Sequence, residues 1–332
     1  MVTRLIALNN FTISDAEDNI LNINGNVNYS FTDPVTFDLT ADADDFTLIN
    51  TTEDSDNPYY GRVIADLDAS ISGTANRPVV NVNVGINEES EFYYTIVNTG
   101  EINAATQGIV EFIEKDTLTS SILNEDEDAD IAENELELDL TANIAIDENA
   151  LFKVIIDPIT NENLTVKGEG NLSFSMKPGN IMTLTGRYEI NEGSYMLSFY
   201  NVVKRNFEID EGSYLSWSGD IMEADANIAA IYRVKTSPLG LVADQLQQIS
   251  ESEREQFNDP SPFLVYLNIQ EDLLSPEISF NIEMPEEERN AVVEAKLNQL
   301  NQNPSELNKQ VFSLLLFKNF YRNPLFPPFG IL

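Results

Sequence analysis

Apolar and polar residues alternate along most of this chain, over unusually long runs. Between positions 135 and 147, apolar side chains occupy every second place, at Leu136, Leu138, Leu140, Ala142, Ile144 and Ile146. The intervening places hold mostly acidic and polar residues. Alternation of this kind is typical of a β-strand with one buried face. Positions 164–176 repeat the pattern, so both segments are predicted to be long, half-buried strands.

The same alternation recurs before and after these two segments. Further predicted strands begin near positions 21, 35, 63, 80, 182, 195, 224, 263 and 278. An antiparallel sheet commonly buries one face and exposes the other, which gives this alternation in the sequence. We therefore predict a mainly β protein built on a long antiparallel sheet.

Glycine recurs on the apolar side of the alternation, as in Leu21-x-Ile23-x-Gly25-x-Val27. A glycine inside a strand marks a bulge, a bend or the close approach of another segment. Asn24-Gly25 could instead form a type I′ hairpin turn. Because the alternation continues across Gly25, a long strand is the preferred interpretation.

One seven-residue segment occurs twice. Glu189-Ile190-Asn191-Glu192-Gly193-Ser194-Tyr195 returns as Glu208-Ile209-Asp210-Glu211-Gly212-Ser213-Tyr214. Each copy is predicted to form a strand, a turn at its Asn/Asp and Gly residues, and a second strand. The spacing is about the length of one β-hairpin, so the sheet is expected to grow by stacking similar units. A calcium-binding turn is the alternative, but neither copy has the spacing of a known ligand loop.

Helical patterns are confined to the last third of the chain. Positions 243–257 are predicted to form a short polar helix. A second helix is expected from Pro285 to about Asn301, because its acidic first turn suits the positive end of the helix dipole. A third helix after Pro304 carries Leu307, Val311, Leu314 and Leu315 at helical spacing. Its apolar surface is wider than one face, so we expect it to dock on the end of the sheet.

These patterns divide the chain into two parts. Residues 1–284 are predicted to form the elongated sheet, with an acidic loop at about 123–134, and residues 285–332 to form two helices and an apolar tail. The acidic loop fails the EF-hand pattern because Ile131 stands where glycine is needed. No run of residues reaches the ~18 to 20 apolar positions of a membrane-spanning helix, and the start lacks a signal-peptide core. We expect a soluble chain, or a fragment whose targeting segment lies upstream and whose native sequence continues.

Composition excludes several classes of function. The chain has 332 residues, of which 42% are hydrophobic, so it can bury a sizeable core. Its formal net charge of -38 opposes contact with phosphate backbones, so no nucleic-acid partner is expected. Histidine and cysteine are both absent, which excludes the common nucleophile systems and the usual zinc and haem ligands. We therefore predict no catalytic residue, no metal, no cofactor and no enzymatic activity.

Several segments together resemble the C-terminal domain of the TamB family. They are the apolar-x-apolar-x-Gly strands, positions 186–219 with the doubled Glu-Gly-Ser-Tyr, and positions 230–234, 267–269, 275–280 and 307–315. The resemblance covers nearly the whole chain and lies in its patterns rather than in catalytic residues. It implies an AsmA-like protein of the Gram-negative periplasm, anchored in the inner membrane and meeting the outer-membrane barrel protein TamA at its C-terminal end. This chain departs from the family in lacking the anchor helix and in ending soon after the third predicted helix.

The resemblance also implies a shape and a role. The sheet would curl into an apolar-lined groove, like a taco, that is implicated in moving phospholipid to the outer membrane and in assembling and secreting outer-membrane proteins. A one-sided apolar sheet must be covered by something, because such a surface is not left in water. An acyl chain of about 16 carbons gains on the order of 10 kcal/mol on leaving water, so an apolar stripe could shield lipid without a specific pocket.

The candidate groove residues are the apolar-face residues of the longest strands. They are Leu138, Leu140, Ile144, Leu164, Val166, Leu172, Phe174, Leu184, Tyr188, Leu197 and Phe199. Ordinary core packing is the alternative role for each of them. Two other functions also remain open: an outer-membrane β-barrel, which shares the alternation and strands of ~10 residues, and a surface-exposed β-sandwich or adhesin module.

Overall fold

The computed structural model describes residues 4–30, 34–54, 57–95, 137–199, 203–221, 223–242, 255, 257–272 and 277–321. The strands are β1 (Arg4–Ser14), β2 (Ile20–Tyr29), β3 (Thr36–Thr51), β4 (Tyr59–Thr74), β5 (Arg77–Ile86), β6 (Glu91–Thr95), β7 (Asp139–Ile146), β8 (Leu151–Asp157), β9 (Glu162–Lys177), β10 (Ile181–Phe199), β11 (Val203–Ile209), β12 (Ser213–Asp220), β13 (Ala224–Thr236), β14 (Ser261–Asp272) and β15 (Glu277–Glu283). The helices are α1 (Leu239–Val242), the 3-10 turn η2 (Glu286–Glu288), α3 (Ala291–Asn301) and α4 (Pro304–Phe317).

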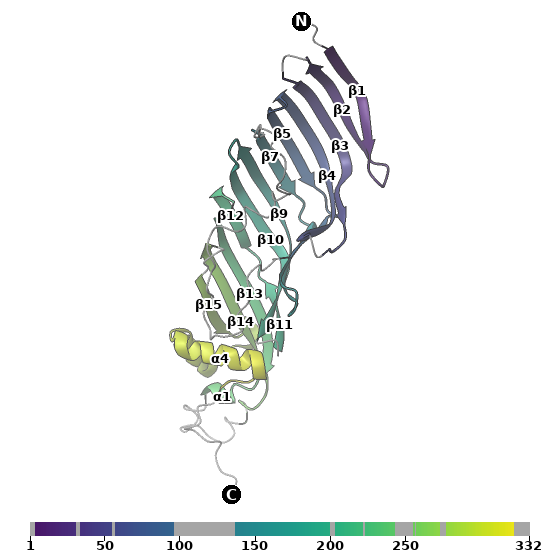
Figure 1. The fold of residues 1–332 in the computed structure, drawn as a ribbon. Helices are drawn as coiled ribbons and strands as arrows, with labels where there is room; N and C mark the ends of the chain where they lie inside the picture. The colour runs from purple at the N-terminus through teal and green to yellow at the C-terminus, as the bar shows by residue number, and fades with distance from the viewer. Residues whose placement is uncertain are drawn as a thin grey trace.

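All 15 described strands belong to one sheet, which runs the length of an elongated molecule (Figure 1). The main order is β1-β2-β3-β4-β5-β7-β9-β10-β11-β13-β14-β15, so β1 and β15 are its two ends. The predicted mainly β fold is confirmed. Two pairs, β5 with β7 and β6 with β8, are parallel and correct the expectation of a fully antiparallel sheet. A parallel pair needs a crossover connection, and positions 96–138 between β6 and β7 are long enough to supply one.

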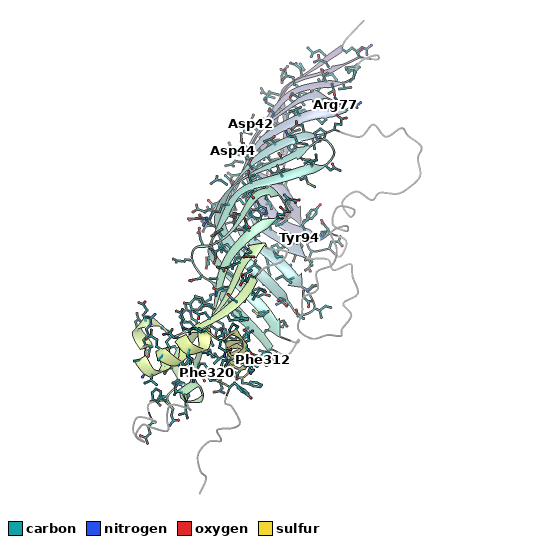
Figure 2. All side chains as sticks on the ribbon, turned by 90° about the vertical axis from the view of Figure 1, so that its left-hand side faces the viewer. Asp42, Asp44, Arg77, Tyr94, Phe312 and Phe320 are labelled. Atoms are coloured by element: carbon teal, nitrogen blue, oxygen red, sulfur yellow. The ribbon has the colours of Figure 1, made fainter. Side chains whose placement is uncertain are left out.

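One face of the sheet stays apolar from strand to strand because the register keeps the alternation in phase. Val84 in β5 pairs with Ile144 in β7, and Ile144 pairs with Leu172 in β9. The neighbouring row, on the opposite face, is polar and contains Asp68, Asn83, Asn143 and Ser173. A slip of one residue would exchange the two faces, so burial of the apolar side fixes the register. Seen from the side, Asp42 and Asp44 lie on one side of the sheet and Tyr94 on the other (Figure 2).

Three strands of the sheet are interrupted at one common level. β5 and β6 are two halves of one strand along β4, separated by positions 87–90. β7 and β8 are halves along β9, and β11 and β12 are halves along β10. The uninterrupted strands shift register at the same level, between Ala43 and Phe46 in β3 and between Ile190 and Glu192 in β10. We call this line of interruptions the crease.

The crease has a sequence motif, Ile-(Asn/Asp)-Glu-x-(Ser/Ala). It separates the half-strands as Ile86-Asn87-Glu88-Glu89-Ser90, Ile146-Asp147-Glu148-Asn149-Ala150 and Ile209-Asp210-Glu211-Gly212-Ser213. In each of these turns the second residue donates its backbone N–H to a carbonyl of the neighbouring strand, at 3.0, 3.0 and 2.7 Å. The last residue of each turn is buried. A fourth copy, Ile190-Asn191-Glu192-Gly193-Ser194, makes the register shift in β10.

The duplicated segment recognised in the sequence is therefore two of these four copies, and its first copy does not form the predicted hairpin turn. Residues 189–195 lie inside β10, because β9 continues unbroken beside them and keeps its ladder as far as Asn163. At Gly193 an added Cβ would lie 3.0 Å from the carbonyl oxygen of Thr165. At Gly212 in the second copy, φ is 83° and an added Cβ would meet nothing within 4 Å, as a free turn requires. The repeat marks the crease and not a series of stacked hairpins.

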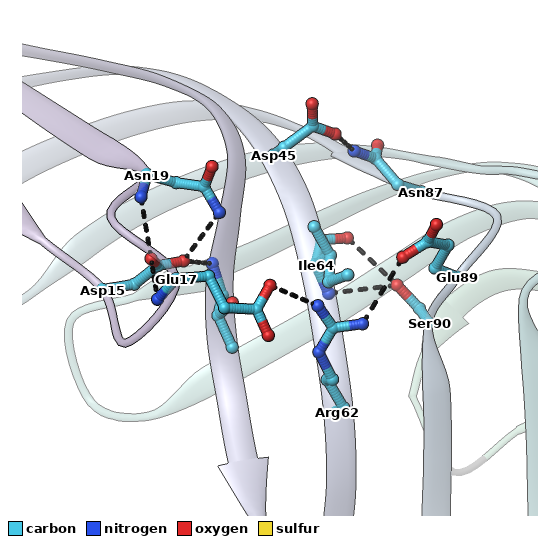
Figure 3. A network of polar contacts seen from close by, with 10 residues as sticks. Asp15, Glu17, Asn19, Asp45, Arg62, Ile64, Asn87, Glu89 and Ser90 are labelled. Atoms are coloured by element: carbon cyan, nitrogen blue, oxygen red, sulfur yellow. Dashed lines mark hydrogen bonds and ion pairs between the residues drawn. The ribbon is translucent and has the colours of Figure 1, made fainter.

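Serine side chains at the crease replace backbone hydrogen bonds that the interruptions remove. The Ser90 hydroxyl accepts from the N–H of Ile64 and donates to its carbonyl, both at 3.0 Å (Figure 3). The Ser213 hydroxyl accepts from the N–H of Ala229 at 3.1 Å and donates to the carbonyl of Asp210 at 2.7 Å. The neighbouring continuous strand therefore keeps its polar backbone groups satisfied where its partner turns away.

Carboxylates have the same role at the bulges of β3. Asp15 accepts from the N–H of Thr47 at 3.0 Å, and Asp66 accepts from the N–H of Asp45 at 2.9 Å. Asp15 also accepts from the backbone and side chain of Asn19 (Figure 3). Desolvation raises the pKa of Asp15, but the hydrogen bonds from Thr47 and Asn19 outweigh it, so the pKa lies well below that of an ordinary carboxyl. Asp15 is therefore charged, and acts as an acceptor, at neutral pH.

Asn24-Gly25 lies inside β2, which confirms the long-strand interpretation. The opposite strand β1 shifts register between Leu8 and Phe11. There the N–H of Asn10 donates to the side-chain oxygen of Asn24 at 2.8 Å. A side chain thus again bridges a position where the backbone ladder is disturbed.

The predicted helix from Pro285 begins later than expected. Positions 286–288 form the 3-10 turn η2, and Arg289 is extended with ψ of 130°. α3 starts at Ala291 because the Asn290 side chain accepts from the N–H groups of Val292 and Val293. The first N–H groups of a helix have no partner within it, and the Asn290 side chain can accept from them whereas Pro285 cannot. The asparagine cap therefore fixes the start of α3.

The C-terminal helices cover the apolar face at one end of the sheet. The buried cluster there joins Phe207, Phe263, Val265 and Ile282 of the sheet to Val293, Leu297, Leu300, Leu307, Val311, Leu314 and Leu315 of α3 and α4. The predicted docking of the last helix on the end of the sheet is confirmed. Arg205 fastens α4 by donating to the carbonyl oxygens of Leu315 and Leu316, at 2.7 and 3.5 Å.

The outer edge of β15 is occupied by a side chain of α3. The Asn301 amide donates to the carbonyl of Ile282 at 3.0 Å and accepts from its N–H at 3.1 Å. One amide group therefore stands in for a neighbouring strand and satisfies this edge.

Two predicted elements lie largely outside the residues that the structure describes. The acidic loop at 123–134 lies outside the described residues, and so does the polar helix at 243–257 except for Glu255 and Phe257. The apolar tail beyond Tyr321 also lies outside them. Within the described ranges, every helix is too short or too polar to cross a membrane.

Replacing Ser90 with alanine tests the crease. The change leaves the buried N–H of Ile64 without its acceptor, so we expect the free energy of unfolding to fall by about 1–3 kcal/mol. Chemical denaturation measures the loss. Ser70→Ala, on the exposed face of the same β4 strand, is the matched control and should change stability by less than about 0.5 kcal/mol. Equal effects of the two substitutions would contradict the role given to Ser90.

Replacing Asn301 with alanine tests the cover on β15. Without the amide, the N–H of Ile282 loses its partner, and its hydrogen exchange should become faster. Exchange measured by NMR or mass spectrometry on β15 reports this directly. Asn308→Ala, at an exposed position of α4, should leave exchange in β15 unchanged. Unaltered exchange at Ile282 in the Asn301 variant would show that the amide does not protect this edge.

Candidate functional site

The apolar face of the sheet between β3 and β12 forms the candidate site, and we call it the trough. Because all the described strands belong to a single sheet, no second sheet in the described part of the chain covers this face. Its side chains on β4 and β5, such as Leu67, Val82 and Val84, are consequently only half-buried. A cover for these side chains must come from somewhere other than another layer of described strands.

The sheet bends toward its apolar face at the crease. Phe152 of β8 lies on one side of the crease and Tyr188 of β10 on the other, yet their rings meet edge to face with centroids 5.8 Å apart. Phe92 of β6 continues the row, 6.3 Å from Phe152. Side chains from the two sides meet in this way when the face that carries them is concave. The crease therefore forms the floor of the trough.

Six predicted groove residues lie together on the wall of the trough. Ile144 pairs with Leu172 across β7 and β9, and Phe174 pairs with Leu184 across β9 and β10. Leu140 lies on the same face of β7, and Leu138 stands half-buried just before that strand. The predicted set left out other apolar residues on the same face, although their alternation has the same phase. They include Leu67, Val82, Val84, Ala142 and Met176.

Trp217 is a further trough residue that the sequence did not single out. It lies in β12 and pairs with Gly186, which in turn pairs with Leu172. An added Cβ at Gly186 would lie 3.1 Å from the Leu172 side chain, so the missing side chain leaves room for its neighbours. Trp217 and Leu172 therefore flank Gly186 on the apolar face. The chain has a single tryptophan, and it lies on the trough wall.

The remaining predicted groove residues lie deeper or at the end of the trough. Val166 and Tyr188 are buried in the cluster at the crease, and Leu164 packs against it. Leu197 packs against the cluster under the C-terminal helices. Phe199 is the last residue of β10 and pairs with Val203, and its side chain is outside the described set.

Two tyrosines bring polar groups onto the apolar face. Burial raises the pKa of Tyr188, so its hydroxyl is neutral, and this buried hydroxyl has no hydrogen-bond partner among the described residues. Tyr195 donates a short hydrogen bond to the carboxylate of Glu162. Burial raises the pKa of Glu162, and the bond from Tyr195 lowers it in part, so the net shift is upward. The Tyr195 hydroxyl and the Glu162 carboxylate therefore form a polar pair on an otherwise apolar surface.

A depression of about 750 Å³ is lined mainly by residues of the opposite, polar face. Its lining includes Asp42, Asp44, Asp66, Asp68, Asn83, Asn143 and Asn171, and it also includes Leu67, Val84, Ile144 and Leu172 of the apolar rows. Asp42 and Asp44 point away from the side that carries Tyr94 (Figure 2). Among the described residues, no group of three or more acidic side chains is arranged to hold a metal ion. Desolvated carboxylates do not suit acyl chains, so the apolar trough is the better candidate site.

The dimensions of the trough suit an extended apolar ligand. The apolar row crosses β3, β4, β5, β7, β9 and β10. At ~4.8 Å between neighbouring strands it extends for roughly 24 Å. Half of the ~30 Å hydrocarbon core of a bilayer, the length of one acyl chain, is about 15 Å. A single acyl chain can therefore lie within the apolar row.

One known protein family matches this chain. The profile of the TamB C-terminal domain matches residues 9–324, almost the whole chain. No curated protein is similar enough in sequence to count as a match. The match begins within β1 and spans the rest of the sheet, the crease, α3 and α4. The chain therefore belongs to the TamB family, through its C-terminal domain, and is a TamB-like protein of the cell envelope.

Proposed function

We propose that the trough shields the acyl chains of phospholipids while they move between the inner and outer membranes. The observation that carries this proposal is the continuous apolar face, half-exposed on β4 and β5 in a chain of net charge -38. A protein with so many acidic residues has enough polar surface to avoid an exposed apolar stripe. An apolar stripe that is retained in this setting is best explained by an apolar ligand.

The stripe is suited to movement rather than to tight capture. Each buried methylene contributes roughly 0.8 kcal/mol, so the free energy of binding is distributed along the acyl chain. A ligand that slides by one carbon loses one contact and gains another. Binding of this kind is favourable at every point along the trough and has no single deep minimum. The role proposed for the protein is therefore non-catalytic, and we expect no enzymatic activity from it.

Family membership supports further parts of the proposal. The domain would act in the periplasm of a Gram-negative bacterium, in a protein anchored to the inner membrane that reaches the outer membrane. Its partner at the outer membrane would be TamA or an equivalent barrel protein, and it would support assembly and secretion of outer-membrane proteins. The C-terminal helices, which pack on one end of the sheet, leave the other end of the sheet, at β1, uncovered by helices among the described residues.

Leu172→Asp tests the proposed function. Leu172 lies in the centre of the trough patch, and a charge placed in hydrocarbon costs about 2.5–3.5 kcal/mol, so phospholipid affinity should fall on the order of 100-fold. Native mass spectrometry of the purified protein measures the bound phospholipid. Ser173→Asp adds the same charge at the next residue of β9, on the polar face, and should leave binding unchanged. Wild-type protein that binds no phospholipid, or equal loss in both variants, would refute the proposal.

A further inference from the structure

The crease divides the walls of the trough into two flaps. The first flap consists of β5, β7 and β12 with the halves of β4, β9 and β10 that pair with them. The second flap consists of β6, β8 and β11 with the other halves of the same three strands. The apolar surfaces of the two flaps face each other across the crease, because Phe152 of the second flap contacts Tyr188 of the first. The angle between the flaps sets the width of the trough.

Three of the strands are interrupted by turns at the crease, whereas β4, β9, β10 and β13 run through it, β10 with a register shift. Side-chain hydroxyls of Ser90 and Ser213 take over hydrogen bonds to the continuous strands β4 and β13. A serine hydroxyl can rotate and keep its bond while the strands change angle, whereas a regular ladder cannot. The crease is therefore the line along which the sheet deforms most easily.

The contact that holds the flaps together is incomplete. The Tyr188 ring contacts Phe152, and its buried hydroxyl has no hydrogen-bond partner among the described residues. A buried polar group without a partner is unfavourable. If the flaps separate, the hydroxyl gains access to water. The unpartnered hydroxyl therefore destabilises the closed arrangement relative to an open one.

We propose that the crease is a hinge, and that an acyl chain in the trough sets the angle between the flaps. This inference rests on the proposed function, because the ligand that separates the flaps is the lipid. An acyl chain inserted beside Phe152 and Tyr188 contacts both flaps when they are apart. When they are closed, these rings occupy its place. Binding therefore favours the open angle through a difference in contact between the two states, as any ligand-driven change requires.

Spin-label distances test the hinge. The chain has no cysteine, so pairs of introduced cysteines can be labelled without a background. Asn206→Cys in β11 and Ser218→Cys in β12 are exposed positions on the two flaps. Asn81→Cys paired with Ser218→Cys lies within the first flap and is the control. On addition of lysophosphatidylcholine below its micellar concentration, we expect the 206–218 distance to shift by more than ~2 Å. The control distance should stay constant.

Tyr188→Phe provides an independent test of the hinge. It removes the unpartnered hydroxyl and keeps the ring against Phe152, so it should fold and should favour the closed angle. In the absence of lipid, the 206–218 distance distribution should be narrower in Tyr188→Phe than in the wild type.

The outcomes separate the hinge from the proposed function. If native mass spectrometry shows bound lysophosphatidylcholine but the 206–218 distance does not shift, the hinge is refuted and the lipid-binding role stands. Equal shifts in both label pairs would also refute it, because the deformation would not be confined to the crease. If no lipid binds, the proposed function fails, and the hinge is then decided by Tyr188→Phe. An unchanged distribution in that variant would overturn it.

Discussion

A single-layer sheet with one apolar face cannot remain flat in water, and the rest of this structure follows from that constraint. Register carries the apolar row from Leu67 through Val84 and Ile144 to Leu172 without a change of face. Among the described strands there is no second sheet to cover the row. The remaining ways to remove it from water are to bend the sheet toward its apolar face, to place helices on it, and to hold an apolar ligand. The structure uses the first two, and the third is the function we propose.

The sheet bends at the crease. There the backbone hydrogen bonds between strands are interrupted, and side-chain hydrogen bonds replace them. Ser90, Ser213, Asp15 and Asp66 each accept from a backbone N–H of a neighbouring strand. The replacements keep the buried backbone satisfied, so the bend does not leave orphan polar groups. The same arrangement is the basis of the hinge that we propose at the crease. At the far end of the sheet, Arg205 and Asn301 fasten the C-terminal helices over the remaining apolar surface.

The sequence predicted what depends on local alternation and missed what depends on distant partners. Strands as long as β9 and β10 follow from alternation alone, and the wide apolar surface around Leu314 correctly predicted a docked helix. The parallel pairing of β5 with β7 depends on a crossover that no local pattern reveals. Two nearly identical segments form a turn at Gly212 and a register shift at Gly193. They differ because only the segment with Gly193 is paired with the unbroken strand β9. The recurrence of Ile-(Asn/Asp)-Glu at positions 86–88 and 146–148 was a usable signal for the crease. Trp217 was missed because the alternation of β12 is short.

The central claim is that acyl chains, and not further protein, cover the trough wall. Trp217 is the single tryptophan and lies on that wall beside Gly186 and Leu172, so its fluorescence reports contact there. The most direct measurement is quenching of this fluorescence by phospholipid with brominated acyl chains, compared with the same lipid without bromine. Strong quenching by the brominated lipid alone is the predicted result. Fluorescence that stays unquenched while the lipid is bound would show that the acyl chains lie elsewhere, and would contradict the account.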